Sequence, residues 1–184
     1  MVRLVDRFRE DVQAILERDP AARGALEAIL FSPGMHALWM HRLNHCLWRA
    51  NFKFLARVLA HLTRMFTGVE IHPGARIGRR VVIDHGMGIV IGETAEVGDD
   101  VMMYHGVTLG GTGFSREKRH PTIGNKVLLG AHAIVLGPIQ VGDGARVGAG
   151  AVVTKPVPPG ATAIGNPAQI IRSESNLESV PVEV

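Results

Sequence analysis

Hydrophobic residues recur with two different periods, and the change falls near residue 68. Before it, apolar side chains return at steps of three and four, as in Leu4, Phe8, Val12 and Ile15, which is the spacing of one face of an α-helix. This pattern predicts a helical segment from residue 2 to about residue 67. We expect a first helix at its start, a second short helix that ends near residue 30, a third near 35–49, and a fourth that carries Phe54, Leu55, Val58, Leu59 and Leu62. Asp19-Pro20 has the form of an N-cap followed by proline at the first helical position, so we expect the second helix to begin there.

From Val69 onward the period becomes six. An aliphatic residue or methionine occupies every sixth position in three runs, separated by a shift of two residues and by one longer interruption. Glycine often follows this residue, and another small or aliphatic residue stands four positions after it. Such a repeat is typical of a parallel β-helix with a triangular section, in which each hexad makes one short strand and one corner. The repeated positions are Ile71, Ile77, Ile83, Ile89, Ile91, Val97, Met103, Leu109, Ile123, Leu129, Val135, Val141, Val147 and Val153.

We therefore predict an α+β protein in which an N-terminal α-helical segment precedes a left-handed parallel β-helix of hexapeptide repeats. The expected division is a helical domain over 1–68, the β-helix over 69–155 with a loop at 110–122, and a closing segment with a flexible tail over 156–184. The loop is glycine-rich and carries four charged residues. Long loops that leave a regular scaffold are usually functional, and a solvated surface insertion is the alternative.

Composition narrows the class of protein. The formal net charge is only +3, and no dense Lys/Arg tract with interleaved aromatic residues appears, so we expect no nucleic-acid partner. The single cysteine, Cys46, excludes an internal disulfide. No run of about 18 apolar residues is present, so no membrane span is expected. The first residues carry charges every two or three positions, unlike a signal peptide, and we expect a cytoplasmic protein.

Asp84 and His85 interrupt an otherwise apolar repeat. Glu70 stands fifteen residues earlier and belongs to the coil beneath, because a coil of three hexads takes about eighteen residues. A carboxylate there could hydrogen-bond the imidazole and fix its tautomer. His85 would then be a base able to take a proton from a hydroxyl. A corner Asp that caps backbone amides beside a surface His is the alternative reading.

The repeat offers no evident nucleophile, because it contains no cysteine and its one serine, Ser115, lies in the loop. Direct attack by a bound substrate hydroxyl therefore fits better than covalent catalysis. In the loop, Arg119 and His120 place a guanidinium beside an imidazole, and arginine binds carboxylates through two parallel hydrogen bonds. His41 and His45 share a helix face, but no further ligand stands at motif spacing, so no metal site is expected.

Five stretches together resemble the serine acetyltransferase family of hexapeptide acyltransferases: VEIHPGARIG, IDHGMGIVIGETA, VTLGGTG, KRHPTIG and PVPPGATAIGNPA. The resemblance continues upstream through ERDPAA and GMHALWMHRLNHCLW, and it covers roughly residues 16–172. The repeat alone would indicate only a hexapeptide acyltransferase. The DHGMGIVIGETA stretch, combined with GGTG and RHP, is more specific.

The resemblance implies a catalytic set. His85 matches the general base, and Glu70 stands where many relatives have the aspartate that orients this base. Asp84 and Asp19 match acidic residues near the serine ammonium, with Asp19 reaching the substrate from the helical domain. Asp19 also has a purely structural alternative as a helix cap.

The resemblance also implies how the two substrates are held. The pair that grips the serine carboxylate from a neighbouring subunit corresponds to Arg119 and His120. The backbone of Gly111, Ala131 and Ala149 matches positions along the coenzyme A arm. Lys155 is assigned to a coenzyme phosphate from its charge alone.

The implied reaction transfers the acetyl group of acetyl-CoA to the hydroxyl of L-serine, giving O-acetyl-L-serine and CoA, the first step of cysteine biosynthesis. Backbone N–H groups would stabilise the oxyanion, and no metal is expected. The β-helix implies a homotrimer. A dimer of trimers is less clearly implied, because the helical segment is short. Relatives that dock into O-acetylserine sulfhydrylase do so with a C-terminal isoleucine, whereas Val184 stands last here.

Three alternatives remain at this point. A hexapeptide acetyltransferase acting on a sugar or antibiotic hydroxyl would share the repeat and the histidine base. A metal hydratase built on such a repeat would use histidines such as His105, His120 and His132 as ligands. A non-catalytic scaffold would need none of these side chains.

Overall fold

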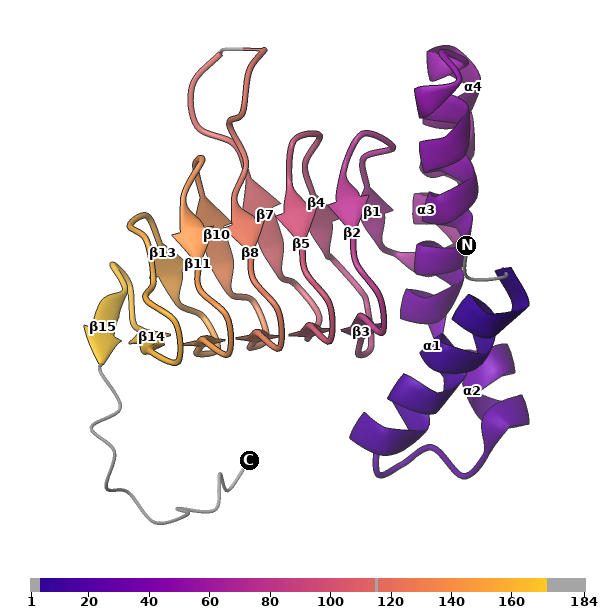
Figure 1. Ribbon diagram of the computed structural model, residues 1–184, viewed down its shortest axis with the longest axis horizontal. Helices are drawn as coiled ribbons and strands as arrows, with labels where there is room; N and C mark the ends of the chain where they lie inside the picture. Colours follow the sequence, from indigo (N-terminus) through magenta and orange to yellow (C-terminus); the bar gives the residue numbers. More distant parts are fainter. Residues whose placement is uncertain (1–3, 115, 172–184) are drawn as a thin grey trace.

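The structure is a computed structural model that describes residues 4–114 and 116–171. Four helices lie at one end, and short strands stacked in successive coils extend away from them (Figure 1). A loop projects from the stack between β7 and β8 (Figure 1). The expected C-terminal tail and its final Val184 lie outside the described residues.

The helices are α1 (Leu4–Arg18), α2 (Ala25–Phe31), α3 (Pro33–Arg49) and α4 (Lys53–Thr67). Proline at the first position suits the start of α3, because its missing N–H would have no partner there. Gly68 ends α4 in the left-handed conformation that glycine adopts without strain. In the described residues, no helix is long and apolar enough to cross a membrane.

The prediction that α2 begins at Asp19-Pro20 is wrong. The helix begins at Ala25, with Gly24 at the N-cap position. Asp19 Oδ1 instead accepts a hydrogen bond of 2.8 Å from the backbone N–H of Ala21. The carboxylate therefore closes a local turn after α1, which is the other common use of an Asp before a proline.

The chain then visits three parallel sheets in turn. The first sheet has the order β1-β4-β7-β10-β13, the second β11-β8-β5-β2, and the third β15-β14-β12-β9-β6-β3. Each turn of the chain adds one strand to each sheet, so the strands form a three-sided prism. The strands are β1 (Glu70–Ile71), β2 (Arg76–Ile77), β3 (Val82–Ile83), β4 (Val90–Ile91), β5 (Glu96–Val97), β6 (Met102–Met103), β7 (Thr108–Gly110), β8 (Thr122–Ile123), β9 (Leu128–Leu129), β10 (Ile134–Leu136), β11 (Gln140–Val141), β12 (Arg146–Val147), β13 (Val152–Val153), β14 (Thr162–Ile164) and β15 (Gln169–Ile171).

The strand register shows where the coils depart from eighteen residues. Ile71 lies opposite Ile91, twenty positions later, because the turn at 84–88 holds two extra residues. Val97 lies opposite Ile123, because the loop inserts eight more. The parallel pairing also continues past residue 155, where Val157 bridges to Val141 and β14 pairs with β12. The last strand, β15, runs antiparallel to β14.

The hexad positions fill the prism interior, as the repeat predicted. Side chains such as Ile91, Leu109, Leu129 and Val135 are at most 1% exposed, and burial of each contributes about 1.5–3 kcal/mol. The exception is Ile77, which is only partly buried at the end of the stack. Neighbouring coils lie about 4.8 Å apart, so each side chain packs on its equivalents above and below.

Helix α3 covers the open end of this core. Ala37 and Leu38 belong to the same buried cluster as Val69 and Ile83. At the helix start, a Cβ on Gly34 would lie 2.2 Å from the carbonyl oxygen of Ile83. The helix can approach the prism this closely only because residue 34 has no side chain.

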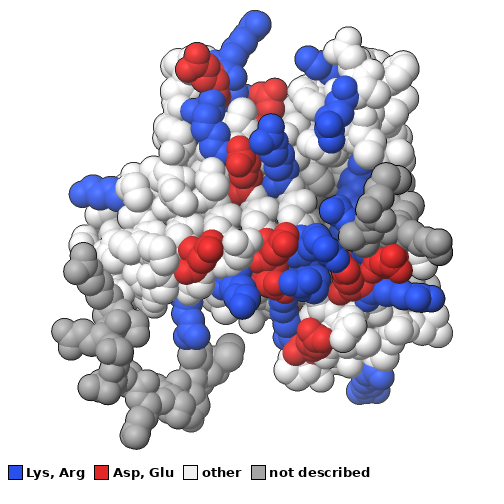
Figure 2. All heavy atoms as spheres, in the orientation of Figure 1, with Lys and Arg blue, Asp and Glu red and all other residues white. Residues whose placement is uncertain are grey.

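Charged residues fasten α1 to the prism. Arg18 donates to the carbonyl of Arg80 at 2.9 Å and to Asp100 at 2.7 Å, while Glu10 pairs with Arg79. A second contact of Asp100, with Arg80, holds the pKa of this carboxyl below its ordinary value. On the face shown in Figure 2, acidic and basic side chains are interleaved where the helices meet the coils.

Candidate active site

The turns between the sheets form three edges of the prism. The histidine edge joins the third sheet to the first, through residues 84–89, 104–107, 130–133 and 148–151. The arginine edge joins the first sheet to the second, through residues 72–75, 92–95, 111–121, 137–139 and 154–156. The docking edge joins the second to the third and carries the partners of α1. The predicted site residues divide mainly between the first two edges.

His85 protrudes from the histidine edge. Its backbone is left-handed, with φ of 56°, and its side chain is 73% exposed. The Nε2 atom lies 3.7 Å from Oδ2 of Asp84, which is an ion-pair distance but too long for a hydrogen bond. A base in this position is open to a substrate that approaches from outside the chain.

Two helix ends frame the turn that carries His85. A Cβ on Gly86 would lie 3.5 Å from the backbone nitrogen of Gly34, at the start of α3. On the other side, the N–H of Gly88 donates to the carbonyl of Gly68, the cap of α4, at 3.0 Å. A Cβ on Gly68 would lie 2.5 Å from the sulfur of Met87. The helical segment therefore fixes the position of the predicted base.

Glu70 has a different partner within the chain from the one the sequence predicted. Its carboxylate lies 2.9 Å from Nη1 of Arg64 in α4. Its strand begins immediately after the histidine edge, and its backbone pairs with Val90. The placement of Glu70 as the orienting group of His85 therefore stays a prediction.

Arg119 lies on the arginine edge and is held by Glu93. Nη2 of Arg119 donates to Oε2 of Glu93 at 2.5 Å. This hydrogen bond is the main reason that the pKa of Glu93 lies below its ordinary value, while partial burial opposes the shift. The guanidinium is therefore held by a carboxylate that stays ionised.

His120 is buried beside Arg119, and Thr94 holds it from the coil below. The Nδ1 atom of His120 accepts from the backbone N–H of Thr94 at 3.2 Å and lies 2.9 Å from the Thr94 hydroxyl oxygen. The same hydroxyl accepts from the backbone N–H groups of Arg119 and His120, at 3.0 and 3.1 Å. Burial, followed by the charge of Arg119, lowers the pKa of His120. A neutral ring that accepts at Nδ1 carries its proton on Nε2.

Two glycines leave room for this ring. A Cβ on Gly92 would lie 2.0 Å from Nε2 of His120, and one on Gly111 would lie 3.0 Å from the same atom. Gly111 is thereby placed beside the Arg119–His120 pair on the arginine edge.

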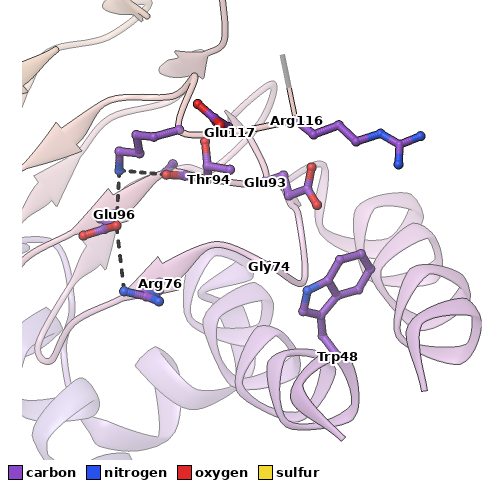
Figure 3. A pocket seen from close by; sticks show the side chains of 10 residues that line it. Trp48, Gly74, Arg76, Glu93, Thr94, Glu96, Arg116 and Glu117 are labelled. Atoms are coloured by element: carbon purple, nitrogen blue, oxygen red, sulfur yellow. Dashed lines mark hydrogen bonds and ion pairs between the residues drawn. The ribbon is translucent and has the colours of Figure 1, made fainter. Parts of the chain in front are cut away.

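A pocket of about 360 Å³ opens beside this edge (Figure 3). Trp48 at the end of α3 forms one side, and Glu93, Thr94 and Arg116 line the other. Lys118 crosses it, donating to the carbonyl of Thr94 at 2.8 Å and lying 3.3 Å from Glu96. The pocket is lined by charged and apolar residues alike, and among them are Glu93 and Thr94, which hold Arg119 and His120.

The remaining predicted residues lie in several places. Ala131 and Ala149 are on the histidine edge, above His85 in the stack, whereas Lys155 is exposed on the arginine edge. Asp19 follows the end of α1, where its neighbour Arg18 binds the docking edge. Among the described residues, no group of three or more His, Cys, Asp or Glu side chains is arranged to hold a metal ion.

Comparison with known proteins shows the family to which the chain belongs. The family model "Serine acetyltransferase, N-terminal" matches residues 2–39, and "Bacterial transferase hexapeptide (six repeats)" matches residues 120–155. Serine acetyltransferase from Mycobacterium tuberculosis is 59% identical over 91% of this chain and 73% of its own. The enzyme from Helicobacter pylori is 56% identical over 89% and 95%. The chain belongs to the serine acetyltransferase family.

Solved structures of the family agree in fold. The crystal structure of the Neisseria gonorrhoeae serine acetyltransferase superposes with a TM-score of 0.89 at 43% identity, over 91% of this chain and 64% of that one. Its complex with serine gives a TM-score of 0.88 at 42% identity, over 91% and 69%. The chain thus spans about two thirds of the length of those proteins.

Two residues that hold the candidate site, Glu93 and Thr94, were not predicted from the sequence. Glu93 and Thr94 hold Arg119 and His120, yet they stand one coil below the loop and look like ordinary corner residues in the sequence. Their signal was the position of GETA directly after the hexad residue Ile91. This signal can be interpreted only when the length of the loop insertion is known, because that length places Arg119 and His120 over the turn that contains Glu93 and Thr94.

Proposed function

We propose that this protein transfers the acetyl group of acetyl-CoA to the hydroxyl of L-serine, giving O-acetyl-L-serine and CoA. The observation that carries the proposal is the division of the predicted residues between two edges of one prism, in a chain 59% identical to a serine acetyltransferase. The proposed base, His85, is exposed on the histidine edge. The pair suited to a carboxylate, Arg119 and His120, stands on the arginine edge.

The placement of the site residues on two different edges implies that the protein acts as an oligomer. Within one chain the two half-sites lie at different corners of a triangular section, so we infer that the histidine edge of one protomer faces the arginine edge of the next. A closed homotrimer of left-handed β-helices satisfies this arrangement three times with identical interfaces.

In such a seam, the residues would divide the work as follows. Arg119 and the Nε2–H of His120 bind the serine carboxylate from one protomer. Asp84 of the other protomer attracts the ammonium group, and Asp19 is proposed to reach it as well. His85 faces the hydroxyl, with Glu70 as its orienting carboxylate. Charge complementarity at both ends selects a small zwitterion and orients its hydroxyl.

The proposed chemistry needs no covalent enzyme intermediate. His85 takes the hydroxyl proton as the serine oxygen attacks the thioester carbonyl, and backbone N–H groups stabilise the oxyanion. The carbon–sulfur bond then breaks, and the imidazolium returns its proton to the departing thiolate. One O–C bond forms, one S–C bond breaks, and the base is regenerated.

The same seam would accommodate acetyl-CoA. In the coil beyond His132, the histidine edge consists of glycine and alanine over residues 148–151, with Ala149 and Gly150 exposed, so an extended chain can lie against the backbone there. Gly111 and Lys155 come from the arginine edge of the adjacent protomer. Lys155 is then a cation available for a coenzyme phosphate.

The alternative substrate class, a sugar or antibiotic hydroxyl, is less well supported. It gives no reason for the carboxylate-binding pair and the acidic residues to share one seam, and the relatives named above are serine acetyltransferases.

Thiol release from acetyl-CoA tests the proposal. L-Serine is compared with homoserine, a galactoside and chloramphenicol as acceptors. We expect serine-dependent release that falls at least about a hundredfold in His85→Asn. Lys126→Asn is the matched control, because Lys126 has the same left-handed backbone, with φ of 55°, on the docking edge. Turnover with a sugar and none with serine would overturn the proposal.

A further inference from the structure

Three histidine rings lie in a column along the histidine edge. The ring centroids of His85 and His105 are 5.8 Å apart at an interplanar angle of 76°, and those of His105 and His132 are 5.0 Å apart at 90°. Each ring comes from a successive coil, so the column rises directly from the proposed base. Both contacts have the edge-to-face geometry in which aromatic rings attract one another.

His132 occupies a backbone position that glycine occupies on the other coils. Its φ is 56°, and the equivalent turn positions hold Gly88, Gly106 and Gly150, with φ of 78°, 71° and 67°. A side chain in the left-handed region costs backbone free energy that glycine does not. The turn itself does not need this side chain, because glycine serves the equivalent position on the other coils.

The neighbouring coil makes room for this ring. A Cβ on Gly106 would lie 2.3 Å from Nδ1 of His132, so the ring of His132 lies against bare backbone and is held beside His105. The ring of His105 is thereby enclosed, and its Nδ1 atom is buried with no hydrogen-bond partner among the described residues.

We propose that His105 and His132 are positioning residues of the acetyl transfer, and that their stacked rings orient His85 and stabilise the imidazolium it becomes. The inference rests on the proposed function of His85. The electron-rich face of a neutral ring attracts a cation placed next to it, so the stack favours the protonated form of His85 during the reaction. Among the described residues, Asp84 has its carboxylate within ion-pair distance of His85.

Variants at His132 distinguish a role in orienting His85 from a role in the stability of the fold. His132→Gly relieves the strained backbone, so we expect the melting temperature to stay the same or rise. We nevertheless expect kcat to fall about threefold to tenfold with an unchanged KM for serine. A structural role would move stability and activity downward together. Lys126→Gly relieves the same backbone strain on the docking edge and should leave kcat unchanged.

Changes at His105 test the ring itself. His105→Phe keeps an aromatic face and should keep most of kcat, whereas His105→Ala should lose about tenfold. The acid limb of the kcat profile should also move to lower pH in His105→Ala, because removal of the ring makes protonation of His85 less favourable. Equal kcat losses in the Phe and Ala variants, without a shifted limb, would overturn the proposal.

An NMR titration tests the ring stack separately from the proposed acetyltransferase function. The ring protons of His85 are followed against pH in the wild-type protein and in His105→Ala. We expect the midpoint of His85 to fall in the variant, whatever the acceptor substrate proves to be. An unchanged midpoint would refute the ring stack even if serine is acetylated. Absence of serine turnover with a shifted midpoint would refute only the acetyltransferase assignment.

Discussion

His85 and Arg119 lie on different edges of the same prism. His85 stands in the turns between the third and first sheets, and Arg119 in the loop between the first and second. Each is held independently, His85 by the ends of α3 and α4 and Arg119 by Glu93. If both act on one serine molecule, they must come from different chains.

This relationship predicts complementation between inactive subunits. His85→Asn and Arg119→Ala chains are each expected to be inactive alone. A trimer that contains both variants should regain about one of its three sites, because a site needs its base from one variant and its arginine from the other. The measurement is thiol release after co-expression of differently tagged chains. Activity absent from purified mixed trimers would place both residues in the same chain's site.

A second prediction concerns the hydroxyl of Thr94. Thr94→Val keeps the side-chain shape but removes the acceptor for the N–H groups of Arg119 and His120 and the contact with Nδ1 of His120. Two unsatisfied donors cost about 1–3 kcal/mol each, and the freed ring can change tautomer. We expect KM for serine to rise about tenfold or more, with KM for acetyl-CoA little changed.

Thr94→Ser retains the hydroxyl and is the matched control. It should keep KM for serine within about threefold of the wild-type value, since the hydrogen bonds are preserved. Equal effects of serine and valine at this position would show that the methyl group, and not the hydroxyl, is what matters.

A third prediction concerns stability in acid. Burial lowers the pKa of His41 to about 3, with the charge of His45 as the second cause. Because the unfolded chain binds this proton near pH 6.5, stability is full above that pH and is lost as the pH falls towards 3. At pH 5 the loss is about 2 kcal/mol. Burial also lowers the pKa of His72, to about 4, so it contributes in the same direction.

Urea unfolding at fixed protein concentration between pH 7 and 5 measures this loss. In His41→Gln, the difference in unfolding free energy between the two pH values should shrink by about 2 kcal/mol, whatever the stability at pH 7. The same substitution at the exposed His61 controls for the loss of one imidazole. An unchanged difference in the His41 variant would mean that His41 is not the residue that titrates.

Much of the fold was readable from the sequence because a stacked repeat is nearly one-dimensional. Each hexad contacts only its neighbours above and below, so the six-residue period alone marked side chains such as Ile91 and Leu129 as interior. The helix start that was predicted wrongly lies outside the repeat. Asp19-Pro20 suits a helix start or a turn equally well, and only the path of the chain between α1 and α2 selects the turn.

The sequence by itself determined the chemistry available to this protein: a histidine beside an aspartate, an Arg-His pair in a loop, and a backbone that winds in hexads. Only the tertiary structure decided which of these groups share an edge. The extra residues at 84–88 and in the loop set the register between coils, and that register stacks His105 and His132 on His85 and places Thr94 beneath His120. Spacing along a chain gives no such information, because contacts between coils depend on the accumulated length of every turn that precedes them.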